Sequence, residues 1–242
     1  MKAFDRQIVI SCEHGGREVP PDYTELFAGQ EDLLESHRGW DPGALELARE
    51  MAAQFEAPLF WSTTTRLLVD LNRSIGHRRL HSEITRDRSR DERAALISQH
   101  YRPHRDAVEG HIAQCVAAGA PVLHIASHSF TPVFYGVERN ADIGWLYDPR
   151  RAEERAFSDR WMQALRRRAP ELRLRRNYPY RGGGDGLATL LRKRFDGASY
   201  LGIELEVSQR FALAGGEPWH RLRRVLVASL MEARSLESES LG

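Results

Sequence analysis

Residues 7–16 read Gln-Ile-Val-Ile-Ser-Cys-Glu-His-Gly-Gly, and this stretch decides the architecture that we expect for the chain. The apolar run Gln7–Ser11 predicts a short buried strand, and the two glycines after His14 allow a tight turn that brings the backbone close to a ligand. The run Val122–His128 has the same form and also ends on a histidine, which is flanked by two serines. In α/β sheets, ligands and catalytic groups collect outside the carboxyl ends of the strands. We therefore expect both histidines at that edge of one sheet.

Strand-like runs alternate with helical stretches along the rest of the chain. Further strands are predicted at 57–61, 67–70, 143–147 and 200–207, and helices at 43–55, 91–118 (interrupted at Pro103), 151–168, 187–195 and 220–236. This alternation predicts an α/β fold with a central, largely parallel sheet that helices cover on both faces. The sequence contains no internal repeat, low-complexity tract or interdomain linker, so we expect one domain over residues 1–242.

The composition is that of a globular protein with a sizeable core. The chain has 242 residues, of which 41% are hydrophobic and 29% charged. Its net charge of +1 does not indicate binding to nucleic acid. The two cysteines, Cys12 and Cys115, are far apart and indicate a reducing compartment. The sequence shows neither a secretory signal nor an apolar run of membrane-spanning length. We expect a cytoplasmic protein that acts on a small molecule, without a nucleic-acid or membrane partner, and the oligomeric state stays open.

The two strand-end histidines, His14 and His128, predict a metal site. Two imidazoles and one carboxylate hold Zn²⁺ and leave a coordination position for water, although Mn²⁺, Co²⁺ and Fe²⁺ accept the same ligands. His124 is an alternative to His128, but it stands inside the apolar run, where a packed histidine is expected. These residues lead to the hypothesis of a metal-dependent hydrolase.

The carboxylate of this site has several candidates. Asp41 stands before Pro42 at the start of a predicted helix, where an aspartate also serves as an ordinary N-cap. Glu13 and Glu18 lie close to His14 in the sequence. Sequence spacing alone does not choose among the three.

Polar residues at two further strand ends are candidates for catalysis and substrate binding. Glu204 and Glu206 lie two residues apart on one predicted strand and share a face, where a buried glutamate is costly unless it is paired or functional. Glu206 is nearer the carboxyl end and is the better candidate for a general base, while an ion pair with an arginine is an alternative for Glu204. Asn72 and Arg73 follow the predicted strand 67–70, and Arg73 is suited to clamp an acidic substrate or to form a surface salt bridge.

Five short motifs occur in an order that resembles the N-formylglutamate amidohydrolase family. They are Ser11–Gly16, Trp40–Ala44, Asp70–Arg73, Ser127–Phe130 and Leu205–Val207, and the resemblance extends from about residue 7 to residue 210. It implies a phosphorylase/hydrolase-like fold, a three-layer αβα sandwich around a mixed, largely parallel sheet. That fold is similar to those of the zinc carboxypeptidases and the muramoyl-alanine amidases.

The resemblance also implies roles for individual residues. Carried over to this sequence, it makes His14, Asp41 and His128 the zinc ligands and Glu206 the general base, with Arg73 and Asn72 binding a substrate carboxylate. The implied reaction is hydrolysis of an N-formyl or other short N-acyl amide of an acidic amino acid such as N-formylglutamate. Two alternatives stay open: a zinc peptidase or cell-wall-type amidase, and a non-catalytic binding protein that retains the fold.

Overall fold

The computed structural model describes residues 6–240, except for the side chains of 237–240. The strands are β1 (Gln7–Cys12), β2 (Leu59–Trp61), β3 (Val122–Phe130), β4 (Val133–Phe134), β5 (Val137–Glu138), β6 (Ile143–Leu146), β7 (Leu174–Arg176) and β8 (Tyr200–Ser208). The helices are η1 (Pro21–Phe27), α1 (Glu31–Glu35), α2 (Ala44–Phe55), α3 (Arg90–Leu96), η2 (Ile97–Tyr101), α4 (Arg102–Ala117), α5 (Ala152–Arg168), α6 (Leu187–Arg194), α7 (Gln209–Ala214) and α8 (Gly216–Ser240).

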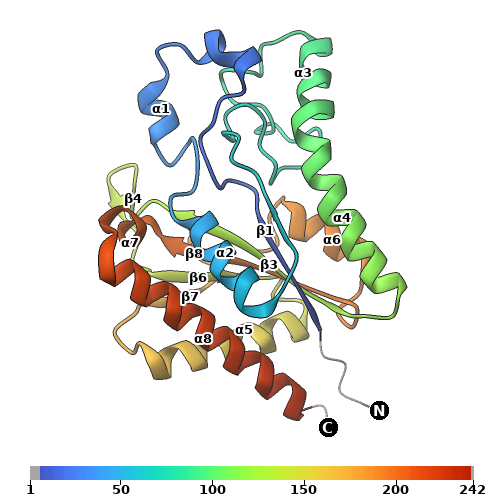
Figure 1. Cartoon of the computed structure of the whole chain (residues 1–242), viewed down its shortest axis with the longest axis vertical. Helices are drawn as coiled ribbons and strands as arrows, with labels where there is room; N and C mark the ends of the chain where they lie inside the picture. Colours follow the sequence, from blue (N-terminus) through green and yellow to red (C-terminus); the bar gives the residue numbers. More distant parts are fainter. Residues whose placement is uncertain (1–5, 241–242) are drawn as a thin grey trace.

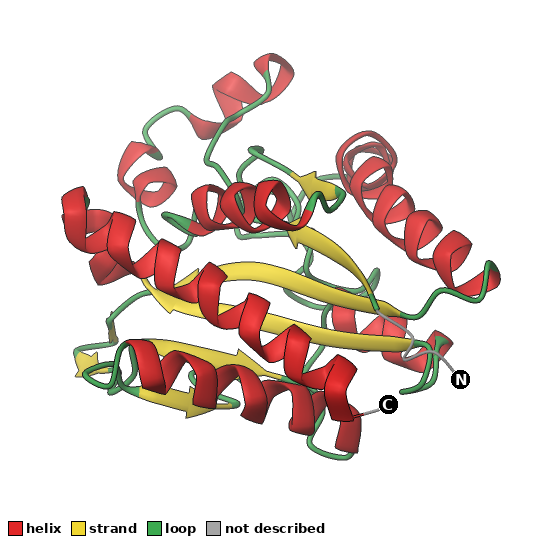
Figure 2. Cartoon of the chain, turned by 60° about the horizontal axis from the view of Figure 1, so that its bottom comes forward, coloured by secondary structure: helices red, strands yellow, loops and turns green. Residues whose placement is uncertain are grey.

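The central sheet is mixed and largely parallel, and the predicted α/β sandwich is confirmed (Figure 1). Within the described residues it contains six strands in the order β2-β1-β3-β8-β6-β7. Strands β2, β1, β3 and β8 run parallel to one another, whereas β6 pairs antiparallel with β8 and parallel with β7. The two histidine-bearing strands, β1 and β3, are direct neighbours, with Ile10 opposite Ile125. Figure 2 shows helices above and below the sheet.

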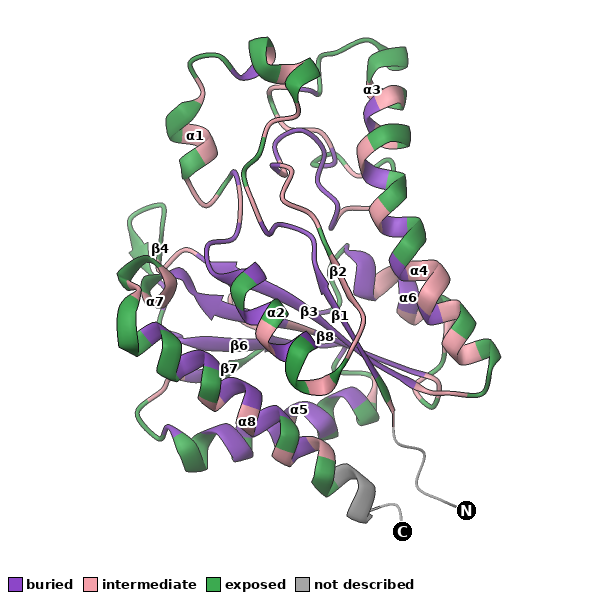
Figure 3. Ribbon diagram, viewed as in Figure 1, coloured by how far each residue is buried: buried purple, intermediate pink, exposed green. Residues whose placement is uncertain are grey.

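The two faces of the sheet bury different sets of side chains because neighbouring residues of a strand point to opposite sides. On one face, alternate strand residues such as Ile8 and Ile10 belong to the large core that includes residues of α2, α5 and α8. On the other face, Val9 and Val122 belong to a smaller core with residues of α4 and α6. Figure 3 shows that the strands in the middle of the sheet are buried. His128 has the same strand parity as Val122 and therefore lies on the α4/α6 face.

Two local predictions were wrong, for physical reasons. The run Leu67–Asp70 forms a turn and an irregular segment instead of a strand, although its residues are at most 6% exposed. An apolar run does not distinguish a strand from a buried loop when no neighbouring strand is there to pair with it. The helical stretch 91–118 is interrupted before Pro103, by the π-helical η2, and Pro103 stands in the first turn of α4, where its missing N–H costs least. None of the helices in residues 6–240 combines the length and apolar character that a bilayer span requires.

The buried imidazole of His124 predicts a pH-dependent stability. Its Nε2 lies 2.8 Å from Ser11 Oγ and its Nδ1 2.8 Å from Tyr200 Oη. Burial lowers the pKa of His124 from 6.5 to about 4. Because the fold favours the neutral ring, the stabilisation is complete above the unfolded-state pKa of 6.5 and is lost as the pH falls toward 4. The total is roughly 3 kcal/mol.

We expect the free energy of unfolding of the wild-type protein to fall more steeply between pH 6.5 and pH 4 than that of a His124→Gln variant, in denaturant titrations at a series of pH values. A His220→Gln variant changes an exposed histidine and is the matched control, with the wild-type slope. Parallel slopes for wild type and His124→Gln would show that His124 does not titrate in this way.

Candidate metal centre

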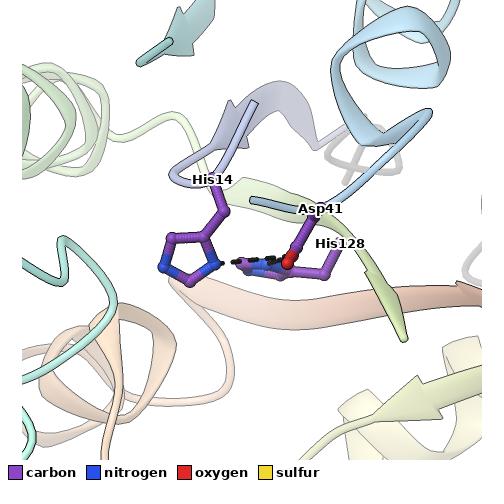
Figure 4. A group of neighbouring side chains, drawn as sticks. All are labelled: His14, Asp41 and His128. Carbon is purple, nitrogen blue, oxygen red and sulfur yellow. Dashed lines mark hydrogen bonds and ion pairs between the residues drawn. The ribbon is translucent and has the colours of Figure 1, made fainter. Parts of the chain in front are cut away.

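Three side chains from distant parts of the chain meet at the carboxyl ends of β1 and β3: those of His14, Asp41 and His128 (Figure 4). His14 stands two residues after β1, Asp41 precedes α2, and His128 lies near the end of β3. One potential ligand atom from each lies within 4.8 Å of the others. The two ring centroids are 5.2 Å apart, well inside the ~8 Å beyond which two imidazoles cannot share an ion at normal bond lengths. All three residues are at most 3% exposed.

Both imidazoles turn the same nitrogen toward Asp41. Oδ2 of Asp41 is 3.0 Å from Nδ1 of His128 and 3.4 Å from Nδ1 of His14. Each Nε2 contacts another carboxylate, with Asp70 Oδ1 2.8 Å from His14 and Glu13 Oε2 3.1 Å from His128. A carboxylate on Nε2 fixes the proton there and leaves Nδ1 as the electron-pair donor, as in metal-bound histidines. The Nδ1 of His14 is buried and has no hydrogen-bond partner among the described residues.

The carboxylate of Asp41 does not cap the following helix, so the N-cap interpretation is wrong. Helix α2 begins at Ala44 after Gly43, and no side chain caps it. The φ of Gly43 is +80°, and a Cβ there would come within 2.5 Å of Ala212, so only glycine fits this turn. The turn lets the backbone N–H of Asp41 donate to the carbonyl of His14 at 2.9 Å and directs the carboxylate to the imidazoles.

Glu13 and Glu18, the alternative carboxylates, lie elsewhere. Glu18 is exposed and accepts a hydrogen bond from Thr63 Oγ1 at 2.6 Å. Glu13 is fully buried between two histidines, with Oε2 3.1 Å from Nε2 of His128 and Oε1 3.5 Å from Nε2 of His104. Glu13 therefore contacts the ring nitrogen of His128 that points away from Asp41 and is placed to orient the imidazole.

The charge balance of the site suits a divalent cation. Three buried carboxylates, those of Glu13, Asp41 and Asp70, surround the two imidazoles, whereas Arg66 is the one guanidinium that contacts them at 4 Å or less among the described residues. Burial alone would raise the pKa of Asp41, but His14, His128 and Arg66 outweigh it and hold the pKa below its usual range. Burial is likewise outweighed at His128, where Asp41 and Glu13 raise the pKa of the imidazole well above its usual value. A metal ion would take the place of such a proton.

We expect a Glu13→Gln variant to bind Zn²⁺ about 10- to 100-fold more weakly than the wild-type protein, because the orienting carboxylate behind His128 is lost. Competition with a chromophoric chelator measures the affinity directly. Glu18→Gln is the matched control, since it alters an exposed glutamate of the same loop and should keep the wild-type affinity. An unchanged zinc affinity in Glu13→Gln would contradict the orienting role.

Glu206 lies on β8, directly across the strand pair from His128. It is 5% exposed, and its Oε2 has no hydrogen-bond partner among the described residues. Burial raises the pKa of Glu206 to about 8. Its other neighbour across the sheet is Gly144 of β6. A Cβ at Gly144 would come within 1.9 Å of the carbonyl oxygen of Tyr178 and 3.5 Å of Glu206, so the glycine allows this close packing.

Of the other sequence candidates, Asn72 and Arg73 form hydrogen bonds within the chain, whereas Glu204 has no ion-pair partner among the described residues. Glu204 shares the face of Glu206, and among the described residues no basic side chain forms an ion pair with it, against the alternative suggested by the sequence. Asn72 accepts a hydrogen bond from the N–H of Leu187 at 2.8 Å, while its Nδ2 lies 3.5 Å from Nε2 of His128. Arg73 donates through Nη1 to the carbonyls of Asn72 at 2.8 Å and Asp185 at 3.0 Å, so both of these bonds use one nitrogen.

Arg66 and His104 also belong to this site, although sequence reasoning assigned them no role. Arg66 donates to Asp70 Oδ2 at 2.7 Å and lies 3.4 Å from Asp41, so it links the two carboxylates that contact His14. Its position four residues before Asp70 in an apolar run is a weak signal in a chain with 35 lysines and arginines. His104 follows Pro103 in a predicted helix far from Glu13 in sequence, and only the fold brings the two side chains together.

Comparisons with known proteins agree with this architecture. The structure is similar to that of a gene product from Agrobacterium tumefaciens, with 29% identity, a TM-score of 0.81, and coverage of 97% of this chain and 92% of that one. It also resembles an N-formylglutamate amidohydrolase from Ralstonia eutropha JMP134 in fold, at 17% identity and a TM-score of 0.73, covering 97% and 95% of the two chains. No curated protein sequence matches the chain significantly. The family model described as N-formylglutamate amidohydrolase matches residues 6–212. The chain therefore belongs to the N-formylglutamate amidohydrolase family, and it is an amidohydrolase by class.

Proposed function

We propose that this protein is a zinc-dependent amidohydrolase that cleaves the N-formyl or other short N-acyl amide of an acidic amino acid such as N-formylglutamate. The products are the free amino acid and a small carboxylate. The family supports the reaction class, and Arg73, whose hydrogen bonds to Asn72 and Asp185 both use Nη1, supports the acidic substrate.

One observation carries the proposal. The Nδ1 atoms of His14 and His128 lie 3.4 Å and 3.0 Å from the same oxygen of Asp41, with both Nε2 atoms held by carboxylates. Two imidazoles and a carboxylate are the protein ligands of many catalytic zinc sites. A zinc ion held there would polarise the acyl oxygen and lower the pKa of a water molecule toward neutrality.

The chain itself supplies proton transfer and substrate binding. In its carboxylate form, Glu206 accepts a proton from the attacking water and returns it to the departing nitrogen as the carbon–nitrogen bond breaks. Its buried Oε2, which has no partner among the described residues, is the acceptor atom in this assignment. Arg73 binds a substrate carboxylate through Nε and Nη2, because its hydrogen bonds to the carbonyls of Asn72 and Asp185 both use Nη1. Asn72, whose side chain lies next to His128, helps Arg73 to bind this carboxylate.

An activity screen over N-formyl, N-acetyl and peptide amides tests the proposal, with metal content measured on the same preparation. We expect about one zinc per chain, hydrolysis of N-formyl or N-acetyl derivatives of acidic amino acids, loss of activity with a chelator and recovery with Zn²⁺.

Other outcomes would identify the alternatives. Cleavage confined to peptides or muramoyl peptides would make the protein a zinc peptidase or cell-wall-type amidase. A protein that carries metal but hydrolyses none of these amides would be a binding protein that retains the fold. A preparation that is active without metal would contradict the proposed chemistry.

A further inference from the structure

Arg139 is a buried guanidinium without a carboxylate partner. It directly follows β5 and is 9% exposed, and no carboxylate of the described residues lies within ion-pair distance of it. Its side-chain hydrogen bonds are long, 3.4 Å to the carbonyl of Thr131 and 3.3 Å to Tyr180 Oη. Burying a charge without a counter-charge costs free energy. Arg66, which contacts the carboxylates of the metal centre, is in contrast paired with two aspartates.

Three aromatic rings surround this guanidinium. Its central carbon lies 4.4 Å from the ring centroid of Phe134, 5.1 Å from that of Tyr180 and 5.9 Å from that of Phe130. Aromatic faces attract a guanidinium but do not neutralise its charge. Rings that stack on the guanidinium leave its in-plane N–H groups as donors, and these fit the two oxygens of a carboxylate.

This aromatic cage adjoins the metal centre. Phe130 stands two residues after His128 on the same strand, so β3 contributes to both places. Tyr180 lies near both places. Burial of its hydroxyl raises the pKa of Tyr180, and this pKa also responds to the charge of Arg139 in the cage and to those of Glu206 and Asp41 at the metal centre.

The cage is also accessible from outside. As whole residues, Tyr180 is 46% exposed and Phe134, on the exposed hairpin of β4 and β5, is 36% exposed (Figure 3). A ligand can therefore reach the guanidinium without opening the core of the protein.

We propose that Arg139, enclosed by Phe130, Phe134 and Tyr180, binds a carboxylate of the substrate's amino-acid part. The inference rests on the proposed function and deepens it, because it assigns a second carboxylate-binding arginine in addition to Arg73. With one arginine for each carboxylate, the site selects dicarboxylic amino acids over those with a neutral side chain.

Calorimetric binding of three reaction products or their analogues to the zinc-loaded full chain tests the proposal. The probes are L-glutamate, L-glutamine, which lacks the side-chain charge, and isoglutamine, which lacks the α-carboxylate charge. Loss of one charge-assisted bidentate contact should weaken L-glutamate binding at least about tenfold in an Arg139→Met variant. The same variant should bind one of the two amides with wild-type affinity, namely the one that lacks the carboxylate held by Arg139.

Controls separate this role from a structural one. Arg139→Lys keeps the charge but not the bidentate geometry and should restore part of the affinity. Arg175→Met changes an exposed arginine on β7 and should bind all three probes as the wild type does. The Tm of Arg139→Met without ligand should be no lower than that of the wild type, since an unpaired buried charge is removed.

The results distinguish the inference from the proposed function. Unchanged glutamate binding in Arg139→Met, or an equal loss for all three probes with a lowered Tm, overturns the role of Arg139. Failure of the wild-type protein to bind any of the probes overturns it too. Discrimination that depends on Arg139 in a protein that hydrolyses no N-acyl amino acid supports the carboxylate site and overturns only the proposed activity.

Discussion

In a Glu206→Gln variant, kcat for amide hydrolysis is expected to fall by about 10²- to 10⁴-fold, the contribution of a positioned general base. Glutamine has the shape of glutamate but does not accept and return the proton of the attacking water. The fold should tolerate the change, because burial already raises the pKa of Glu206 to about 8 and disfavours the carboxylate form. Steady-state kinetics and metal analysis of the same preparation measure both effects, and the zinc content should stay near one per chain.

Glu204→Gln is the matched control for this experiment. Glu204 lies two residues earlier on the same face of β8, opposite Ala126 of β3, whereas Glu206 is opposite His128. We expect a much smaller effect on kcat from Glu204→Gln. Loss of zinc from Glu206→Gln would show that Glu206 is a metal ligand. Equal losses of kcat in the two variants would contradict its role as the general base.

The second large effect is expected in a His128→Gln variant, which should bind zinc more than about 100-fold more weakly and lose its hydrolytic activity. Mutating a residue that hydrogen-bonds to a metal ligand typically lowers the metal affinity 10- to 100-fold, and loss of the ligand itself should lower it further. The variant should also be less stable by about 3–5 kcal/mol, since Asp41 and Glu13 stay buried after their shared partner is removed. Metal analysis after dialysis and chemical denaturation measure the two effects.

His124→Gln provides the comparison. His124 lies four residues earlier on β3, is fully buried and contacts Ser11 and Tyr200 instead of the three candidate ligands. This variant should keep one zinc per chain. If the His128→Gln protein also kept its zinc after dialysis, His128 would not be a metal ligand.

The strands that decide this fold could be predicted because they are buried on both faces. Such strands are continuous apolar runs, and β1, β3 and β8 were all identified from them. The short edge strand β7 and the hairpin of β4 and β5 do not follow from the sequence: each strand has only two or three residues, and charged or exposed side chains replace the apolar run that marks the equally short β2. The composition of Leu67–Asp70 predicts a strand because burial, not strand pairing, determines it.

The site was predictable to the extent that it depends on strand ends. Parallel strands bring their carboxyl ends to one edge, and this rule alone predicts that His14 and His128 lie together. The position of Asp41 was ambiguous because an aspartate before a helix has the same local sequence whether it caps the helix or turns away from it. Glu13 and Arg139 were not assigned their partners, because burial and pairing in a chain with 35 basic and 34 acidic residues depend on tertiary packing.

The central claim is that His14, Asp41 and His128 bind one metal ion, and anomalous diffraction at the zinc absorption edge tests it most directly. From crystals of the protein purified without added metal, we predict a single strong anomalous peak. It should lie about 2.0–2.2 Å from the Nδ1 atoms of His14 and His128 and from an oxygen of Asp41. A peak bound by other side chains, or crystals grown with Zn²⁺ that show no peak between these three residues, would contradict the claim.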